Sequence, residues 1–322
     1  MRTCSRAFLS AAVLMFGLAS LGLQAAPSSS ANAKSTGWKV LSKEPSRADL
    51  FSIIREASLK EQDALQPGGR VLPSSFKLPS DATYDEIADK PRVNSIFGID
   101  ISHHTGKSIR MDKLWGQRVR FVYAKATQGV GFKDPLFEQY WKSLAKLPEG
   151  ERPRRGSYHF LSYKGEGKAQ AQSYLRLISQ AGGSIPGDMP PVMDLEWDKA
   201  TRDGPDRWKS KSPDQIIRIA REWLDEVAAK TGRKPMVYTS FQWWRERIGD
   251  ERLVDRLAPY KVWVADYSKS ARGVEDPRVP AGLVWHLWQF SDSAILGEGY
   301  GGKLDVNIFK GTEEQFISTF SE

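Results

Sequence analysis

Two carboxylates lie two positions apart in the otherwise apolar stretch "PPVMDLEWD" at residues 190–198. The apolar neighbours predict a buried strand, where an unpaired carboxylate is costly. Because alternate side chains of a strand share a face, Asp194 and Glu196 point the same way, with Cα atoms roughly 6.6–7 Å apart. Two such carboxylates can form an acid–base pair that cleaves a glycosidic bond, one protonated and one ionised. Trp197 can supply an apolar wall that raises the pKa of Glu196.

Two further carboxylates lie at the ends of other apolar stretches: Asp100 ends "FGID" and Asp305 begins "LDVN". In a barrel, active sites lie at the C-terminal ends of the strands, so four carboxylates from three strands can meet in one cleft. Each acid taken singly can instead be a structural residue in an ion pair. Carboxylates with His103, His104 or His159 can also hold a divalent ion, but adjacent histidines are not a characteristic ligand spacing. We therefore predict no metal and no cofactor.

The elements that must position these side chains alternate along the chain. Helices are predicted at 134–147, 167–181 and 212–232, between or beside the strands. Alternation of strands and helices favours a parallel sheet, and eight strands favour an α/β fold of the (β/α)₈ barrel class. An open doubly wound sheet is the alternative, but no G-x-G-x-x-G follows the first strand. The predicted strands span residues 95–102, 120–127, 154–162, 190–197, 235–240, 261–268, 284–291 and 304–309.

The helix at 212–232 has the best-defined ends. Ser212 can cap its N-terminus, Pro213 suits its first position, and Gln215 completes a capping box. Gly232 can end it.

The N-terminal third of the chain divides differently. Residues 1–26 predict a secretory signal, because basic residues precede an apolar run and small residues follow it. A membrane anchor is the alternative, but the run is short for a stable span. Residues 27–92 predict a leader of unknown role, with one amphipathic helix near 46–65 and then a linker rich in Pro, Gly and Ser. Residues 93–322 form the predicted catalytic barrel.

Composition excludes some chemistry. The only cysteine of the 322 residues is Cys4, inside the predicted signal, so the mature chain has no disulfide and no thiolate nucleophile. The net charge of +8 can favour nucleic acid, an anionic membrane or anionic cell-wall polymers as a partner. It can equally serve only to keep the protein soluble, because the charges are scattered and form no long basic run. Aromatic side chains near the predicted strand ends can stack on sugar rings or form core; they are Tyr123, Tyr158, Phe160, Trp197, Tyr238, Trp263, Tyr267, Trp288 and Phe290.

Residues 96–310 resemble glycoside hydrolase family 25, the lysozyme-type N-acetylmuramidases. The matching pieces follow the family's order: "FGIDISHHTG", "FVYAKATQG", "FKDPLFEQYW", "GSYHF", "PPVMDLEWD", "MVYTS", "VWVADY", "WQFSD" and "LDVNIF". The resemblance implies a modified (β/α)₈ TIM-like barrel with an N-terminal extension. It also implies a peptidoglycan hydrolase that cleaves the β-1,4 bond between N-acetylmuramic acid and N-acetylglucosamine, and the predicted signal adds that this enzyme is exported.

The resemblance also implies roles for single residues. Glu196 is the expected proton donor, Asp194 its neighbour in the D-x-E pair, and Asp100 and Asp305 are the acids of the first and last strands. The expected substrate-binding residues come from the matching pieces: Tyr158, Tyr238, Trp288, Trp263, Lys125 and His159.

The chain departs from the family pattern at two places. Thr105 stands where a Gln is frequent, and Gln128 where a Glu is frequent. These changes affect local hydrogen bonds and subsite preference rather than the carboxylate set.

Several alternatives stay open. The chain can be a non-catalytic cell-wall sugar-binding protein, or a glycosidase acting on another N-acetylated polysaccharide such as chitin. A retaining, an inverting and a substrate-assisted mechanism are all compatible with the D-x-E pair. The expected partner is the peptidoglycan glycan strand, bound by an exported monomer with no stable membrane insertion after signal cleavage.

Overall fold

The computed structural model describes residues 52–57, 72–249, 251–257, 259–280 and 283–321. Every described residue belongs to one compact unit, which lies within Gly37–Glu322. The predicted signal and most of the predicted helix near 46–65 lie outside the described residues.

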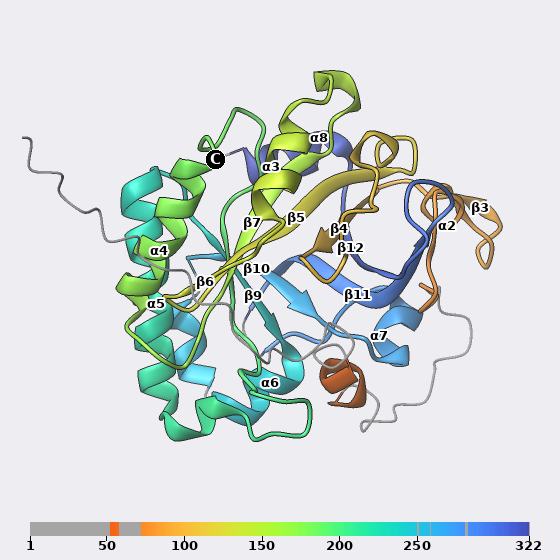
Figure 1. The fold of residues 1–322 in the computed structure, drawn as a ribbon. Helices are drawn as coiled ribbons and strands as arrows, with labels where there is room; N and C mark the ends of the chain where they lie inside the picture. Colours follow the sequence, from red (N-terminus) through yellow and green to blue (C-terminus); the bar gives the residue numbers. More distant parts are fainter. Residues whose placement is uncertain (1–51, 58–71, 250, 258, 281–282, 322) are drawn as a thin grey trace, which may run out of the picture. The chain divides into compact units, whose positions relative to one another are not determined.

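Eight strands close into a barrel, as Figure 1 shows. Each strand pairs with the next in the order β11-β10-β9-β8-β7-β5-β4-β12, and β12 pairs back with β11. The predicted barrel is therefore confirmed, with every predicted strand present. The barrel strands are β4 (Ser95–Ile101), β5 (Val119–Gln128), β7 (Arg154–Phe160), β8 (Val192–Asp194), β9 (Met236–Ser240), β10 (Lys261–Ala265), β11 (Trp285–Leu296) and β12 (Leu304–Lys310).

The direction of the last strand differs from the prediction of a parallel sheet. β12 runs antiparallel to both β11 and β4, whereas the other neighbours in the barrel are parallel. The reason is local: only residues 297–303 join β11 to β12, and they form no helix. A parallel return needs a crossover of about a dozen residues or more, so this short connection makes a hairpin.

Two aromatic rings of β5 pack inside the sheet below the C-terminal strand ends, because the strands on either side of β5 carry glycine at these levels. A Cβ on Gly98 of β4 would lie 2.4 Å from the ring of Phe121, and one on Gly156 of β7 would lie 2.2 Å from the ring of Tyr123. The Tyr123 hydroxyl donates to the carbonyl of Pro190 at 3.1 Å. The barrel is thus a packed core below the strand ends, not a pore.

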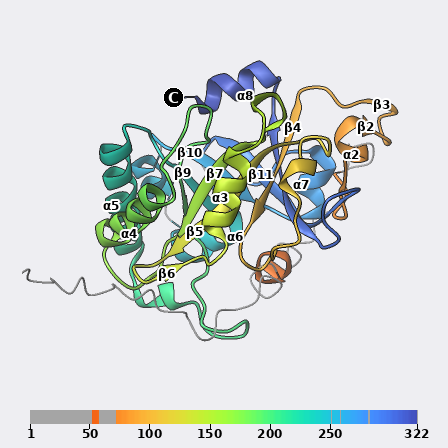
Figure 2. The ribbon, with the colours of Figure 1, turned by 45° about the horizontal axis from the view of Figure 1, so that its top comes forward.

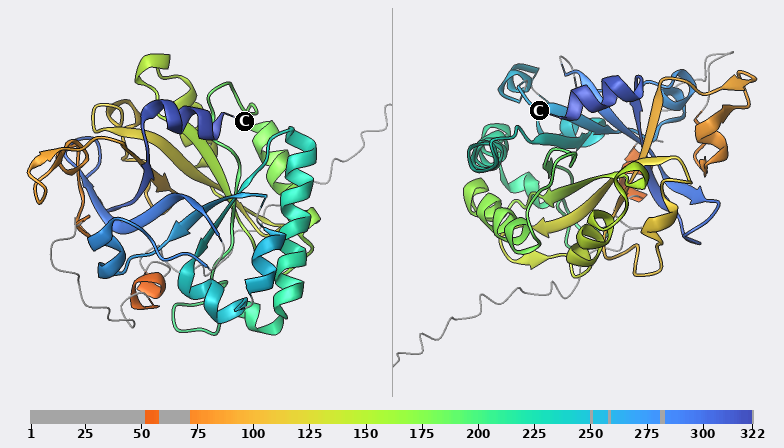
Figure 3. Two further views of the ribbon diagram at one scale, coloured as in Figure 1. Left: turned by 180° about the vertical axis from the view of Figure 1, so that it is seen from behind. Right: turned by 90° about the horizontal axis from the view of Figure 1, so that it is seen from above.

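Helices cover the outside of the barrel, and α4 and α5 run side by side (Figures 2 and 3). The predicted ends of α5 are confirmed: Ser212 and Gln215 form the capping box, and Gly232 ends the helix at a φ of 69°. The helices are α3 (Phe137–Ala145), α4 (Gly167–Gln180), α5 (Pro213–Thr231), α6 (Phe241–Arg247), α7 (Lys269–Val274) and α8 (Glu313–Phe320), with 3₁₀ turns at Met111–Lys113, Glu149–Glu151, Arg207–Ser210 and Glu251–Arg256. No helix in the described part of the chain combines the length and apolarity that crossing a membrane requires.

The segment before the barrel is more than a linker. Strand β1 (Lys77–Leu78) pairs with the end of β11, and Phe76 is fully buried against the rings of Phe97 and Phe290 at 4.8 and 5.2 Å. The proposed boundary at residues 92 and 93 therefore falls inside the packed unit, because apolar residues between 72 and 78 complete its core. Short elements complete this segment: α2 (Ser80–Thr83), β2 (Tyr84–Asp85) and β3 (Lys90–Pro91), while β6 (Phe132–Lys133) pairs with β5.

This packing makes a prediction about stability. We expect Phe76→Ala to lower the free energy of unfolding by about 3–5 kcal/mol, because a buried ring is lost and a cavity remains. Urea unfolding followed by circular dichroism measures this. The control is Ile87→Ala, where a side chain that is 61% exposed is shortened and a change within about 0.5 kcal/mol is expected. Equal, small effects would show that residues 72–78 do not belong to the folded core.

Candidate active site

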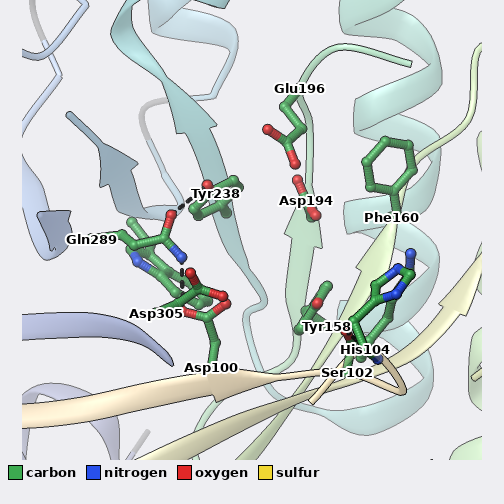
Figure 4. Close-up of a pocket in the computed structure, with 12 residues that line it drawn as sticks. Asp100, Ser102, His104, Tyr158, Phe160, Asp194, Glu196, Tyr238, Gln289 and Asp305 are labelled. Atoms are coloured by element: carbon green, nitrogen blue, oxygen red, sulfur yellow. Dashed lines mark hydrogen bonds between the residues drawn. The ribbon is translucent and has the colours of Figure 1, made fainter. Parts of the chain in front are cut away.

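Four carboxylates gather in one pocket at the C-terminal ends of the barrel strands. Asp100, Asp194, Glu196 and Asp305 all line it, and all four are buried. In Figure 4 the carboxyl groups of Asp194 and Glu196 point toward one another, and those of Asp100 and Asp305 lie together across the pocket. The structure therefore brings together the whole carboxylate set that the sequence predicts.

The antiparallel direction of β12 places Asp305 in this set. Asp305 lies near the start of β12 and Asp100 near the end of β4, and the two are directly paired in register. In a parallel strand, a residue near the start would lie at the opposite end of the barrel.

Glu196 lies beyond its strand rather than in it. β8 ends at Asp194, and Glu196 occupies a bend that follows. Asp194 and Glu196 nevertheless line the same pocket, although Glu196 is not part of the strand. The Leu195 amide still donates to the carbonyl of Tyr238 at 2.9 Å, which holds the bend against β9 and keeps Glu196 on the pocket side.

Neutral amides and phenols hold Asp100 in place. One carboxylate oxygen of Asp100, Oδ2, accepts hydrogen bonds from Nε2 of Gln289 and Nδ2 of Asn307, each at 2.8 Å. The Gln289 carbonyl oxygen in turn accepts from the hydroxyls of Tyr238 and Tyr267 at 2.8 and 2.6 Å. The Gln289 oxygen accepts from two hydroxyls, and its nitrogen donates to a carboxylate. These partners determine which way round the amide group lies.

A second arm of the network ends on an indole. Nε1 of Trp263 donates to Oδ1 of Asn307 at 2.8 Å. Two predicted aromatic residues, Tyr238 and Trp263, thus line the pocket and also orient the amides behind it.

The electrostatics of the D-x-E pair favour a proton on Glu196. Burial raises the pKa of Glu196 well above its ordinary value, and the charge of Asp194 raises it further, while Lys125 lowers it. Burial also raises the pKa of Asp194, which Lys125 opposes more strongly than any other group. Oδ1 of Asp194 is buried and accepts no hydrogen bond from a described residue, so this oxygen remains available to a ligand.

Lys125 is the cation of the pocket. Its ammonium donates to Oε1 of Gln128 at 2.6 Å. Gln128 stands at a position where the family that this sequence resembles frequently has Glu. Because Gln is neutral, residue 128 brings no negative charge to its contact with Lys125. The charge of Lys125 therefore acts on the carboxylates across the pocket.

Two predicted binding residues lie elsewhere. His159 is fully buried on the helix side of β7, where its ring contacts Thr127, Gln170 and Trp223, and burial lowers its pKa to about 3. Trp288 is also fully buried, and its Nε1 donates to the carbonyl of Asp266. We correct both assignments: adjacent residues of a strand face opposite ways, so these two side chains point away from the pocket that Tyr158 and Gln289 line.

The remaining lining residues were only partly predicted. The sequence predicts Tyr158 as a binding residue and Phe160 only as one of several aromatic residues that can stack on sugars. It predicts no sugar-binding role for Ser102, His104 or Gln289. Ser102 and His104 directly follow β4, so proximity to Asp100 was the available signal. Gln289 belongs to "WQFSD", but a neutral amide has no charge that would single it out.

The donor set fits acid–base chemistry better than metal binding. Among the described residues, no group of three or more His, Cys, Asp or Glu side chains could hold a metal ion. The arrangement offers a buried carboxyl with a raised pKa, a second carboxyl beside it and aromatic walls, which are the groups needed to cleave a glycosidic bond.

Comparison with known proteins agrees with this chemistry. Residues 99–298 match the family described as glycosyl hydrolases family 25. The chain is 30% identical over 229 residues to the uncharacterised protein YegX of Escherichia coli O157:H7, spanning 70% of this chain and 73% of that protein. It is 28% identical over 229 residues to lysozyme M1 of Streptomyces globisporus, spanning 70% and 71%. The solved bacterial lysozyme of Streptomyces coelicolor is 27% identical, with a TM-score of 0.58 and coverage of 70% and 97%.

The raised pKa of Glu196 makes a prediction about stability. A carboxyl with a raised folded-state pKa stabilises the fold below its unfolded pKa, and this contribution is lost as the pH rises. We therefore expect the stability of Glu196→Gln relative to the wild type to increase between about pH 4 and about pH 8. Unfolding free energies at both pH values test this. Glu314→Gln, at an exposed position, is the control, and its free energy of unfolding relative to the wild type should be nearly the same at both pH values. An equal pH dependence in both variants would contradict the raised pKa of Glu196.

Proposed function

The chain belongs to glycosyl hydrolases family 25, and from this premise we propose that it is a peptidoglycan hydrolase of the muramidase type. It cleaves the β-1,4 bond between N-acetylmuramic acid and N-acetylglucosamine by carboxylate acid–base catalysis. The observation that carries the proposal is the buried pair of Asp194 and Glu196, facing Asp100 and Asp305 in one pocket lined with aromatic side chains.

The first step assigns Glu196 as the general acid. Its proton is held by burial and by the charge of Asp194, so it is present when the substrate arrives. Transfer of this proton to the glycosidic oxygen breaks the bond, because the leaving sugar departs as a neutral hydroxyl. The Glu196 carboxylate that remains can then take a proton from the attacking water.

Asp194 acts on the sugar whose anomeric carbon loses the glycosidic oxygen. Cleavage leaves positive charge near the anomeric carbon of the sugar, and an ionised Asp194 stabilises this oxocarbenium-like centre. Because its Oδ1 accepts no hydrogen bond from a described residue, no described donor has to be displaced for this role.

Asp100 and Asp305 act on the pair from a distance. Their negative charges raise the pKa of Glu196 further. The amides of Gln289 and Asn307 hold Asp100 so that this charge has a defined position.

Substrate contact and localisation are also part of the proposal. Tyr158, Tyr238 and Trp263 supply ring faces for the sugars, and Lys125 supplies a cation. The proposed partner is the glycan strand rather than nucleic acid, and the proposed acting form is a monomer. The basic n-region and apolar run within residues 1–26 support export to the compartment that holds the cell wall.

The direct test is Glu196→Gln. This change keeps the size of the side chain but removes the transferable proton, so we expect turnover on purified peptidoglycan to fall by about 10²–10⁴-fold. The release of reducing ends measures turnover, and borohydride reduction followed by sugar analysis identifies the new end. A muramidase leaves N-acetylmuramic acid at that end.

The matched control is Glu314→Gln, at an exposed position of α8, which should leave turnover unchanged. Near wild-type turnover of a folded Glu196→Gln protein would reject the assigned acid. New reducing ends that carry N-acetylglucosamine would reject the proposed bond, and the absence of hydrolysis by the wild type would favour a non-catalytic sugar-binding protein.

The charge coupling within the pair predicts a change in the pH profile. Asp194→Asn removes a negative charge that raises the pKa of Glu196, so Glu196 should lose its proton at lower pH. We expect the alkaline limb of kcat/KM, measured on soluble glycan fragments, to move to lower pH in this variant, on top of a lower maximum. An alkaline limb that stays in place would show that Asp194 does not set the protonation of the acid.

A further inference from the structure

A helical segment at residues 52–57 lies outside the family match at residues 99–298. Ile54 is fully buried in the hydrophobic core. Nη2 of Arg55 donates to Oδ1 of Asp292 at 2.5 Å, and Nη2 of Arg202 donates to Oε1 of Glu56 at 2.7 Å. The segment is therefore tied to two parts of the barrel that are far apart in the sequence.

The strand order gives the position of this helix. Asp292 belongs to β11, and Arg202 belongs to the segment that follows β8. In the barrel, β10 and β9 lie between these two strands, so the helix spans the side of the mouth where β9 and β10 end. In Figure 1 the helix lies near α6 and α7, which follow those two strands. This is the end of the barrel that holds the catalytic carboxylates.

A groove of about 470 Å³ separates the helix from the segment after β8. Ile53, Glu56 and Ala57 line one side, and the other side begins at Trp197. Glu196 lines the catalytic pocket and Trp197, the next residue of the chain, lines the groove. Nε1 of Trp197 donates to Oε2 of Glu246 at 3.3 Å, which fixes the indole at the wall of the groove.

The charges of the groove favour an anionic occupant. Three of its acids are engaged by arginines: Glu56 by Arg202, and both Asp206 and Glu246 by Arg247. Two ammonium groups, those of Lys199 and Lys209, also line it and form no ion pair with a described residue. Asp203 and Arg245 line the groove as well, so its lining carries five cationic and four acidic side chains, a net charge of +1.

We propose that this groove binds the acidic peptide carried by the glycan, with helix 52–57 as its outer wall. The inference rests on the proposed muramidase function, because the groove can only select substrates that reach Glu196. Lys199 and Lys209 attract the carboxylates of the peptide, while Ile53 and Ala57 offer an apolar surface to its side chains. Ile53, Glu56 and Ala57 are thereby substrate-binding residues contributed from outside the family region.

The experiment compares two substrates on the full chain. One is glycan strands with their peptides, and the other is the same strands after enzymatic removal of the peptides. For Lys199→Gln/Lys209→Gln we expect KM for the peptide-bearing strands to rise roughly three- to tenfold, since each partly exposed charge contact contributes modestly. KM for the peptide-free strands and kcat for both should stay close to wild type.

The role of the helix is tested by Arg55→Gln, which removes the tie to Asp292 and should raise KM for the peptide-bearing strands alone. Lys142→Gln on α3, whose side chain is 52% exposed, is the matched control and should change neither KM. Melting curves verify that each variant is folded. The inference is overturned if, in either test variant, the ratio of KM for peptide-bearing strands to KM for peptide-free strands stays at its wild-type value. An equal rise of both KM values is one such result. Absence of hydrolysis of both substrates by the wild type would instead refute the proposed function.

Discussion

The burial of ionisable carboxyls in one pocket is the constraint on which the rest of this structure depends. Asp194 and Glu196 lie in surroundings that disfavour negative charge, so the pair retains a proton that an exposed pair would lose. Such a pocket is stable only if its remaining polar groups are satisfied. Gln289, Asn307 and the tyrosines provide that satisfaction, and the Lys125 ammonium limits the accumulated negative charge.

The closure of the barrel serves the same constraint. A short connection forces β12 to return antiparallel, and this direction brings Asp305 to the rim where Asp100 ends its strand. The same strand carries Asn307, which donates to Asp100. One hairpin therefore closes the sheet, adds a carboxylate and supplies a hydrogen-bond donor for another, so stability and chemistry depend on the same contacts.

The segment before the barrel extends this arrangement. Phe76 and β1 complete the core at the end of β11, and residues 52–57 contact both β11 and the segment after β8. Composition had indicated a linker here, because Pro, Gly and Ser are frequent between residues 66 and 80. In the part that the structure describes, Ser74, Ser75 and Pro79 lie in turns between buried apolar residues. A local composition cannot show that an isolated apolar residue such as Phe76 meets a distant partner.

The amino-acid sequence by itself determined the eight strands, the ends of α5 and the identity of the four carboxylates, because periodicity, capping and charged residues in apolar runs are local signals. The tertiary structure decided the rest. Strand direction at β12, the bend that holds Glu196 beyond β8, and the outward placement of His159 and Trp288 all depend on which strands become neighbours. The amide network of Gln289 and Asn307 is of the same kind: neutral groups become functional only through the partners that a closed barrel brings to them.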